Sequence, residues 1–208
     1  NDTATTEIYT RTYTLSLHDA LPISAFDVLQ SLGADMRHVR FPDVTDMVAD
    51  WGTACAAETA VAHEPWHPKN KHLYGPGLGG LIEFGRSISA VEMQKIWLRR
   101  RAFTGAVRGF FQNCDLLLIP AQPMASPTTQ EMSVIGTVPA ELARLIKFTA
   151  PFDMSGSPTI TLPAGFTVKN TPVAIQLVSA HLDEATLIRA GSAFQRVTDW
   201  HSRVPPRL

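Results

Sequence analysis

Apolar residues recur at helical spacing along most of the chain after residue 24. The first such stretch predicts a helix with Phe26, Val28 and Leu29 on one face, ended by Gly33. The same spacing predicts further helices over 43–63, 78–86, 89–112 and 140–149. Asp183 is expected to cap a last helix. The apolar face of that helix would consist of Leu187, Ile188, Phe194, Val197 and Trp200.

Short runs of β-forming residues lie between these helices. Residues 36–41 predict a strand closed by Pro42. The continuous apolar run over 115–120 is typical of a strand buried on both faces in the middle of a sheet. Two β-rich runs on either side of residues 167–171 predict an antiparallel hairpin. Together these elements predict an α/β fold, a mixed β-sheet flanked by helices.

Three stretches lack these periods. Residues 63–80 combine proline, glycine and histidine, and residues 121–138 are rich in proline, serine and threonine, so both are expected to be loops. Residues 1–24 include YTLSLHDALPIS, which resembles translated sequencing-adapter read-through. We therefore expect residues 1–24 to be a non-native or disordered leader and residues 25–208 to form the domain.

Composition and charge narrow the classes of function. The 18 lysines and arginines against 19 aspartates and glutamates give a formal net charge of -1. Such a chain has no global basic surface for nucleic acid or for an anionic membrane. No apolar run reaches the roughly 20 residues that a membrane-spanning helix needs. The two cysteines, Cys55 and Cys114, cannot form a disulfide framework, which is typical of a reducing compartment. We expect a cytoplasmic protein without nucleic-acid or membrane partners.

The string HEPWH at 63–67 matches H-E-x-x-H, the zinc-protease signature in which two histidines bind the metal and the glutamate activates water. That geometry needs an unbroken helix, and Pro65 interrupts it at a cost of about 3 kcal/mol. We favour a polar loop after a helix end. A zinc metallopeptidase that uses His63, Glu64 and His67 stays open as an alternative.

Other polar clusters carry weaker signals. Residues 153–158, DMSGSP, join a predicted helix to a strand, where hydroxyls and backbone N–H groups can face a pocket. Neither G-x-S-x-G nor S-x-x-K is present, so no standard serine-nucleophile signature is met. Residues 99–101 are three arginines that we interpret as a solvated helix face. The two cysteines are expected to be small buried hydrophobes.

Several stretches of the chain together carry a family resemblance. FTAPFDMSGSPTITLPAGF is followed by TPVAIQLVSAHLDEATLIRAGSAFQ and by Trp200–His201. Earlier pieces agree, among them LGADMRHVRFP, the helix near Glu58, YGP, SISAVE and DLLLIPAQPMASP. In this order they resemble the C-terminal portion of the amidase signature family, over about residues 25–205. The resemblance implies a large α/β domain with helices around a mixed sheet.

Members of that family hydrolyse or transfer amides through a serine nucleophile, a second serine in a cis peptide and a lysine base. The lysine and the Gly-Ser-rich loop belong to the N-terminal half of the family, and no GGSSGG-like string occurs in these 208 residues. We therefore expect no catalytic residue in this chain, which would be a C-terminal fragment that is inactive alone. The resemblance implies no cofactor and no metal.

The resemblance implies that this chain forms one wall of a pocket for a small-molecule amide. The matching substrate-binding positions are Gln122, Thr149, Asp153, Ser155 and Gly156. Asp153 stands where the family often has asparagine. Gly80 and Leu81 stand where the amidotransferase A subunits carry arginines, which counts against an amidotransferase and favours a less charged amide.

Our leading interpretation is the C-terminal part of an amidase, a hydrolase of carbon–nitrogen amide bonds. Two alternatives from other classes stay open: the zinc metallopeptidase described above, and a non-catalytic binding or scaffold protein. Assembly as a homo-oligomer is also left open.

Overall fold

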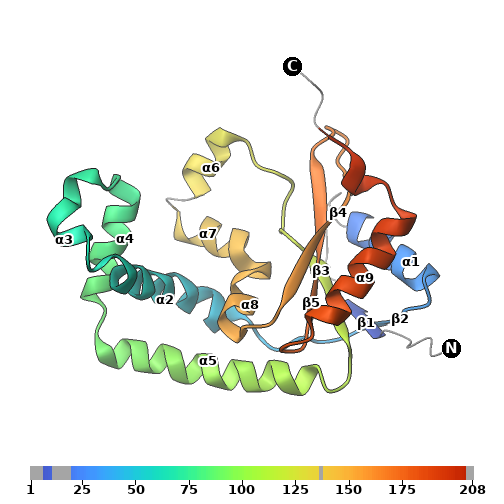
Figure 1. Ribbon diagram of the computed structural model, residues 1–208, viewed down its shortest axis with the longest axis horizontal. Coiled ribbons are helices and arrows are strands. Elements are labelled where there is room, and N and C mark those ends of the chain that lie inside the picture. Colours follow the sequence, from blue (N-terminus) through green and yellow to red (C-terminus); the bar gives the residue numbers. More distant parts are fainter. Residues whose placement is uncertain (1–6, 11–19, 136–137, 205–208) are drawn as a thin grey trace.

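The computed structural model describes residues 7–10, 20–135 and 138–204, which form a five-stranded sheet between two layers of helices (Figure 1). The strands are β1 (Glu7–Thr10), β2 (Asp35–His38), β3 (Leu116–Pro120), β4 (Thr159–Phe166) and β5 (Pro172–Ser179). Their order is β2-β1-β3-β5-β4. β1 is parallel to β2 and β3, whereas β5 is antiparallel to β3 and β4. The predicted α/β fold with a mixed sheet and a hairpin is confirmed.

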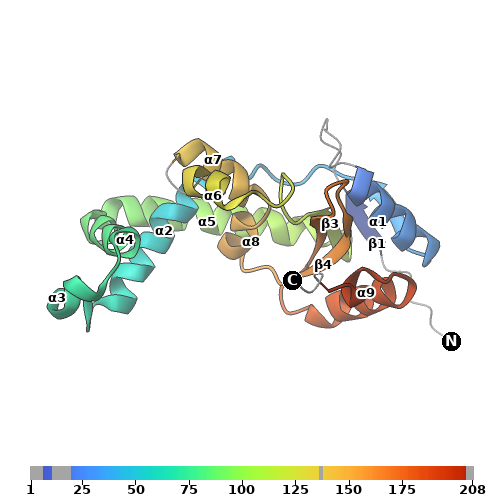
Figure 2. The same cartoon turned by 90° about the horizontal axis from the view of Figure 1, so that it is seen from above.

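The helices cover both faces of this sheet. α1 (Ala20–Ser31) and α9 (Glu184–Val197) cover one face, and α2 (Thr45–His63), α5 (Ala90–Phe110) and α8 (Ala150–Ser155) cover the other (Figure 1). The remaining helical elements are α3 (His67–Asn70), η2 (Lys71–Leu73), α4 (Pro76–Ser87), α6 (Thr129–Ile135), α7 (Pro139–Leu145), η3 (Ile146–Phe148) and η4 (Trp200–Ser202). The far end of α2 extends away from the sheet together with α3 and α4 (Figure 2). None of the described helices combines the length and the hydrophobicity that crossing a bilayer requires.

β3 lies in the middle of the sheet and divides the core into two parts. Leu116 and Leu118 pack in the layer of α1 and α9, and Leu117 and Ile119 pack in the layer of α2, α5 and α8. This division follows because successive side chains of a strand point to opposite faces. All four side chains are at most 9% exposed, which confirms the prediction of a central strand buried on both faces.

Several helix ends follow the sequence signals. α1 ends before Gly33, whose φ of +94° lies in the region that favours glycine. At the start of α2 the carboxylate of Asp43 accepts hydrogen bonds from the backbone N–H and the hydroxyl of Thr45. Asp183 precedes α9 as expected, but its carboxylate accepts from the hydroxyl of Thr186 rather than from a backbone N–H.

The apolar face of α9 is narrower than the prediction. Leu187 and Phe194 are buried against the sheet, but Ile188 is 64% exposed and Val197 is 56% exposed. With 3.6 residues per turn, each of these two lies roughly 80–100° around the helix from Leu187. Trp200 lies beyond the helix in η4 and packs against Phe166 of β4.

The two predicted loops were wrong in part, because each contains helix. Residues 63–80 include α3 and the start of α4, and residues 121–138 include α6. Pro76 stands at the first turn of α4, where a missing backbone N–H is tolerated. Thr128 and Glu131 form a capping box at α6: each side chain accepts from the backbone N–H of the other residue.

Regular elements also occur within the predicted leader. β1 occupies the sheet position between β2 and β3, and α1 begins at Ala20, before the expected start of the domain at residue 25. The rest of residues 1–24 up to Asp19 lies outside the described residues. The non-native origin expected for this stretch stays a prediction.

α2 and α4 approach each other most closely at Gly85. A Cβ placed there would lie 2.0 Å from the carbonyl oxygen of Ala56 and 3.0 Å from the Cβ of Ala60. We therefore predict that Gly85→Ala lowers the free energy of unfolding by about 1–3 kcal/mol, because the two helices must separate. Urea unfolding followed by circular dichroism measures the change.

Gly80→Ala is the matched control on the same helix. A Cβ at Gly80 meets no atom within 4 Å, so alanine is expected to raise the free energy of unfolding by up to about 1 kcal/mol. A Gly85→Ala protein as stable as Gly80→Ala would contradict the close contact of α2 and α4.

Candidate functional site

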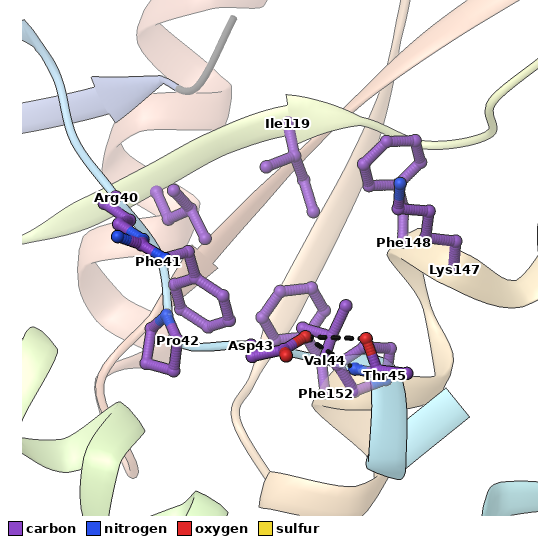
Figure 3. Close-up of a pocket in the computed structure, with 12 residues that line it drawn as sticks. Arg40, Phe41, Pro42, Asp43, Val44, Thr45, Ile119, Lys147, Phe148 and Phe152 are labelled. Carbon is purple, nitrogen blue, oxygen red and sulfur yellow. Dashed lines mark hydrogen bonds between the residues drawn. The ribbon is translucent and has the colours of Figure 1, made fainter. Parts of the chain in front are cut away.

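A pocket of about 310 Å³ lies on the face of the sheet that carries α2 and α8 (Figure 3). Its residues come from the connection between β2 and α2, from β3, and from the segment that joins α7 to α8. They are Arg40, Phe41, Pro42, Asp43, Val44, Thr45, Leu117, Ile119, Lys147, Phe148, Pro151 and Phe152. Apolar side chains form most of the lining, and the volume suits a small organic molecule.

The strand order explains where this pocket lies. β2 and β3 are both parallel to β1, so their carboxyl ends lie at the same edge of the sheet. The chain leaves β2 at this edge and enters α2 through residues 40–44, which line the pocket. In α/β folds the carboxyl ends of parallel strands are where ligands bind. The topology therefore favours this pocket as the candidate site.

Four of the five predicted site residues lie in one segment, residues 148–157, which we call the pocket wall. The rings of Phe148 and Phe152 from this wall line the pocket, but none of the predicted residues does. Thr149 and Asp153 are exposed, whereas Ser155 is buried with 4% exposure. Gly156 ends the wall's helix, and Gln122 is exposed in the connection after β3.

Side chains from distant elements hold the pocket wall in place. The amide nitrogen of Gln176 in β5 donates to the carbonyl oxygen of Phe148 over 2.8 Å. The indole N–H of Trp51 in α2 donates to the carboxylate of Asp153 over 3.0 Å. The Asp153 side chain is thereby oriented although it is exposed.

The arginines at 99–101 were wrongly predicted to be a solvated face. The guanidinium of Arg100 donates to the carbonyl oxygens of Met154 (2.6 Å) and Asp153 (3.3 Å) in the pocket wall. Arg99 donates two hydrogen bonds, of 2.6 and 2.8 Å, to the carboxylate of Asp50 in α2. Within this run only Arg101 is exposed. α5 therefore fixes both α2 and the pocket wall through charged hydrogen bonds.

The end of the pocket wall is a tight, hydrogen-bonded turn. Gly156 has a φ of +71°, and its N–H donates to the carbonyl oxygen of Phe152. The hydroxyls of Ser155 and Ser157 lie 2.8 Å apart, and Nε2 of His181 is 2.8 Å from the carbonyl oxygen of Ser155. Among the described residues no basic side chain is hydrogen-bonded to either hydroxyl. The turn lacks the base that activates a serine nucleophile.

Sequence reasoning missed the residues that hold the wall: Trp51, Arg100, Gln176 and His181. Their partners lie 26 to 102 residues away along the chain, so no local pattern reveals the contacts. Gln176 offered the one usable signal, a polar residue within the apolar strand β5, where it is only 4% exposed.

The HEPWH string does not have the geometry of a zinc site. α2 ends at His63 and α3 begins at His67, so the helix is broken around Pro65 as predicted. Nδ1 of His63 is 3.0 Å from the hydroxyl of Tyr74, and His67 packs edge-on against the same ring. Nδ1 of His67 lies 3.8 Å from Glu83, whose pKa is lowered mainly by its hydrogen bond with a lysine ammonium. No cluster of three metal-ligating side chains occurs in the part of the chain that the structure describes.

Within the described residues neither cysteine forms a disulfide, so both are thiols. Cys114 is buried as predicted, whereas Cys55 is only half-buried. Burial and then the nearby carboxylates of Glu58 and Asp153 raise the pKa of the Cys55 thiol. These surroundings disfavour the thiolate, so Cys55 does not have the features of a nucleophile.

Comparison with known proteins gives a consistent family. The Amidase family model matches residues 23–188. AmiD of Mycobacterium tuberculosis, which is named a putative amidase, is 44% identical over 151 residues, covering 73% of this chain and 32% of AmiD. An amidase of Pseudomonas putida is 29% identical over 185 residues, covering 88% of this chain and 40% of that protein. The chain thus spans about a third of the length of AmiD.

A shorter match and two solved structures extend the comparison. The glutamyl-tRNA(Gln) amidotransferase A-type chain of Chloroflexus aggregans is 40% identical over 96 residues, covering 46% of this chain and 19% of that protein. A 6-aminohexanoate cyclic dimer hydrolase superposes with a TM-score of 0.83 and 20% identity, covering 99% of this chain and 48% of that one. A bacterial aryl acylamidase gives 0.75 and 20%, covering 95% and 44%. At these identities the structures establish a shared fold.

The contacts of the pocket wall give a direct test of Arg100. We predict that Arg100→Met lowers the free energy of unfolding by about 1–3 kcal/mol, because two wall carbonyls lose a charged donor. Urea unfolding measures the change, and the control is Arg101→Met on the exposed side of α5, expected within about 0.5 kcal/mol of the parent. Equal losses for both variants would contradict the role of Arg100.

Proposed function

The chain belongs to the amidase signature family, and from this membership we propose that it forms one side of the substrate pocket of an amide hydrolase. The reaction is the hydrolysis of a carbon–nitrogen amide bond in a small molecule. The observation that carries the proposal is the family match over residues 23–188, which includes the whole pocket and the whole pocket wall.

The predicted site residues have distinct parts in this proposal. Thr149 and Asp153 present exposed polar side chains on the pocket wall, and Asp153 is oriented by Trp51, so both are suited to hydrogen-bond an amide. Ser155 and Gly156 set the backbone of the turn rather than offer a free hydroxyl. Gln122 supplies an exposed amide after β3. Each of these roles is a proposal about substrate binding.

We propose that the 208-residue chain does not turn over substrate by itself. A serine attacks an amide only when a base takes its proton and donors hold the oxyanion. The sequence contains no GGSSGG-like loop, and the Ser155–Ser157 turn has no basic partner within the described residues. The nucleophile, the second serine and the lysine base would come from outside these 208 residues.

Within the family we place the chain with the amidases rather than with the amidotransferase A subunits. Gly80 and Leu81 stand where those subunits carry arginines, and α4 offers no cation at either position for a charged glutamine backbone. The two cysteine thiols support a cytoplasmic location. Exposed apolar side chains on α4 and α5, such as Phe84 and Val91, support a homo-oligomer.

A chimera tests the proposed function. Residues 23–188 replace the matching segment of the Pseudomonas putida amidase, and a second chimera uses AmiD, the more similar background. We predict that a chimera with a cooperative thermal melt releases ammonia or amine from simple amides. We also predict that the double variant Thr149→Val, Asp153→Ala lowers its kcat/KM by about tenfold or more, because two hydrogen bonds to the amide are lost.

The isolated 208-residue chain is the companion sample in the same assay, and we expect no turnover from it. Turnover by the isolated chain would contradict the proposed inactivity. Chimeras that melt cooperatively in both backgrounds yet hydrolyse none of the amides would contradict the assignment of the pocket wall to amide hydrolysis.

A further inference from the structure

The pocket next to the wall has an aromatic interior that the predicted site residues do not account for. Phe41 and Phe152 are at most 8% exposed, and their ring centroids lie 5.7 Å apart. Ile119 of β3 and Phe148 of η3 face the same space (Figure 3). Such a lining removes a flat or aliphatic ligand body from water, which is the main source of binding energy in small-molecule pockets.

The charged groups of the lining are unequally satisfied. Two cations, Arg40 and Lys147, and one carboxylate, Asp43, leave the lining with a net charge of +1. The Asp43 carboxylate already accepts the N–H and the hydroxyl of Thr45. Within the described residues Arg40 takes part in no hydrogen bond or ion pair, and its side chain is exposed to solvent. A guanidinium at the mouth of an apolar pocket is a preformed partner for an anionic oxygen pair.

We propose that this pocket binds a monocarboxylate with an apolar body. The carboxylate lies against the guanidinium of Arg40, and the body lies between Phe41 and Phe152. The net charge of +1 matches one carboxylate rather than a divalent phosphate, and the apolar interior excludes a strongly hydrated ligand. Amide hydrolysis releases an acid of this class, so identifying the ligand as a reaction product rests on the proposed function. The binding itself does not.

Binding to the full 208-residue chain tests the inference without any turnover. The probes are 3-phenylpropanoate and 3-phenylpropanamide, which share one body and differ in the charge of the head group. Calorimetric titration at neutral pH is expected to give the acid an affinity at least about tenfold above that of the amide, because only the acid pairs with Arg40. Added salt should narrow this difference.

Two variants separate the charge from the pocket. Arg40→Gln is expected to bring the affinity for the acid down to that for the amide, whereas the control Arg86→Gln, on the exposed side of α4, keeps the difference. Val44→Phe places a ring in the pocket lining and is expected to abolish binding of both probes while Arg40 stays in place. Circular dichroism verifies that each variant is folded.

Three results would overturn the inference: equal affinity for acid and amide, binding of neither probe, or a folded Arg40→Gln protein that still prefers the acid. Binding that survives Val44→Phe would likewise overturn the location. The chimera assay and this titration can fail independently. Loss of turnover with intact acid binding removes only the proposed function, and turnover without acid binding removes only this inference.

Discussion

The structure depends on the burial of β3 on both of its faces. Leu116 and Leu118 join one core, and Leu117 and Ile119 join the other, so a single five-residue strand holds two helical layers together. Leu117 and Ile119 also form the inner side of the pocket. Because the same residues serve the core and the pocket, the site cannot move relative to the sheet without a loss of buried apolar contact.

The pocket wall is held differently, by polar contacts from three elements. Trp51 of α2, Arg100 of α5 and Gln176 of β5 each donate a hydrogen bond to it. Backbone carbonyls that would otherwise be buried without partners gain donors in this way. The wall is short, so these contacts rather than helix propensity determine its shape. A preformed wall needs no rearrangement on binding, which favours affinity.

The sequence predicted the fold better than the site, for a physical reason. Apolar periodicity and turn residues are local, and they located the β3 run, the hairpin and the end of α1 at Gly33. The contacts of Arg100 join residues more than 50 positions apart, and a run of three arginines carries no sign of which one is buried. The capping box at Thr128 and Glu131 was a local signal of helix α6, and it was overlooked.

Residues 148–157 form a rigid wall beside the pocket in the chain itself, and the candidate site depends on this rigidity. Hydrogen exchange of backbone amides tests it most directly, because the N–H groups of Gly156 and Ser157 both donate to Phe152. These two amides are predicted to exchange far more slowly than that of Val168, whose side chain is 98% exposed in the hairpin turn. Equally fast exchange at all three positions would contradict a preformed wall.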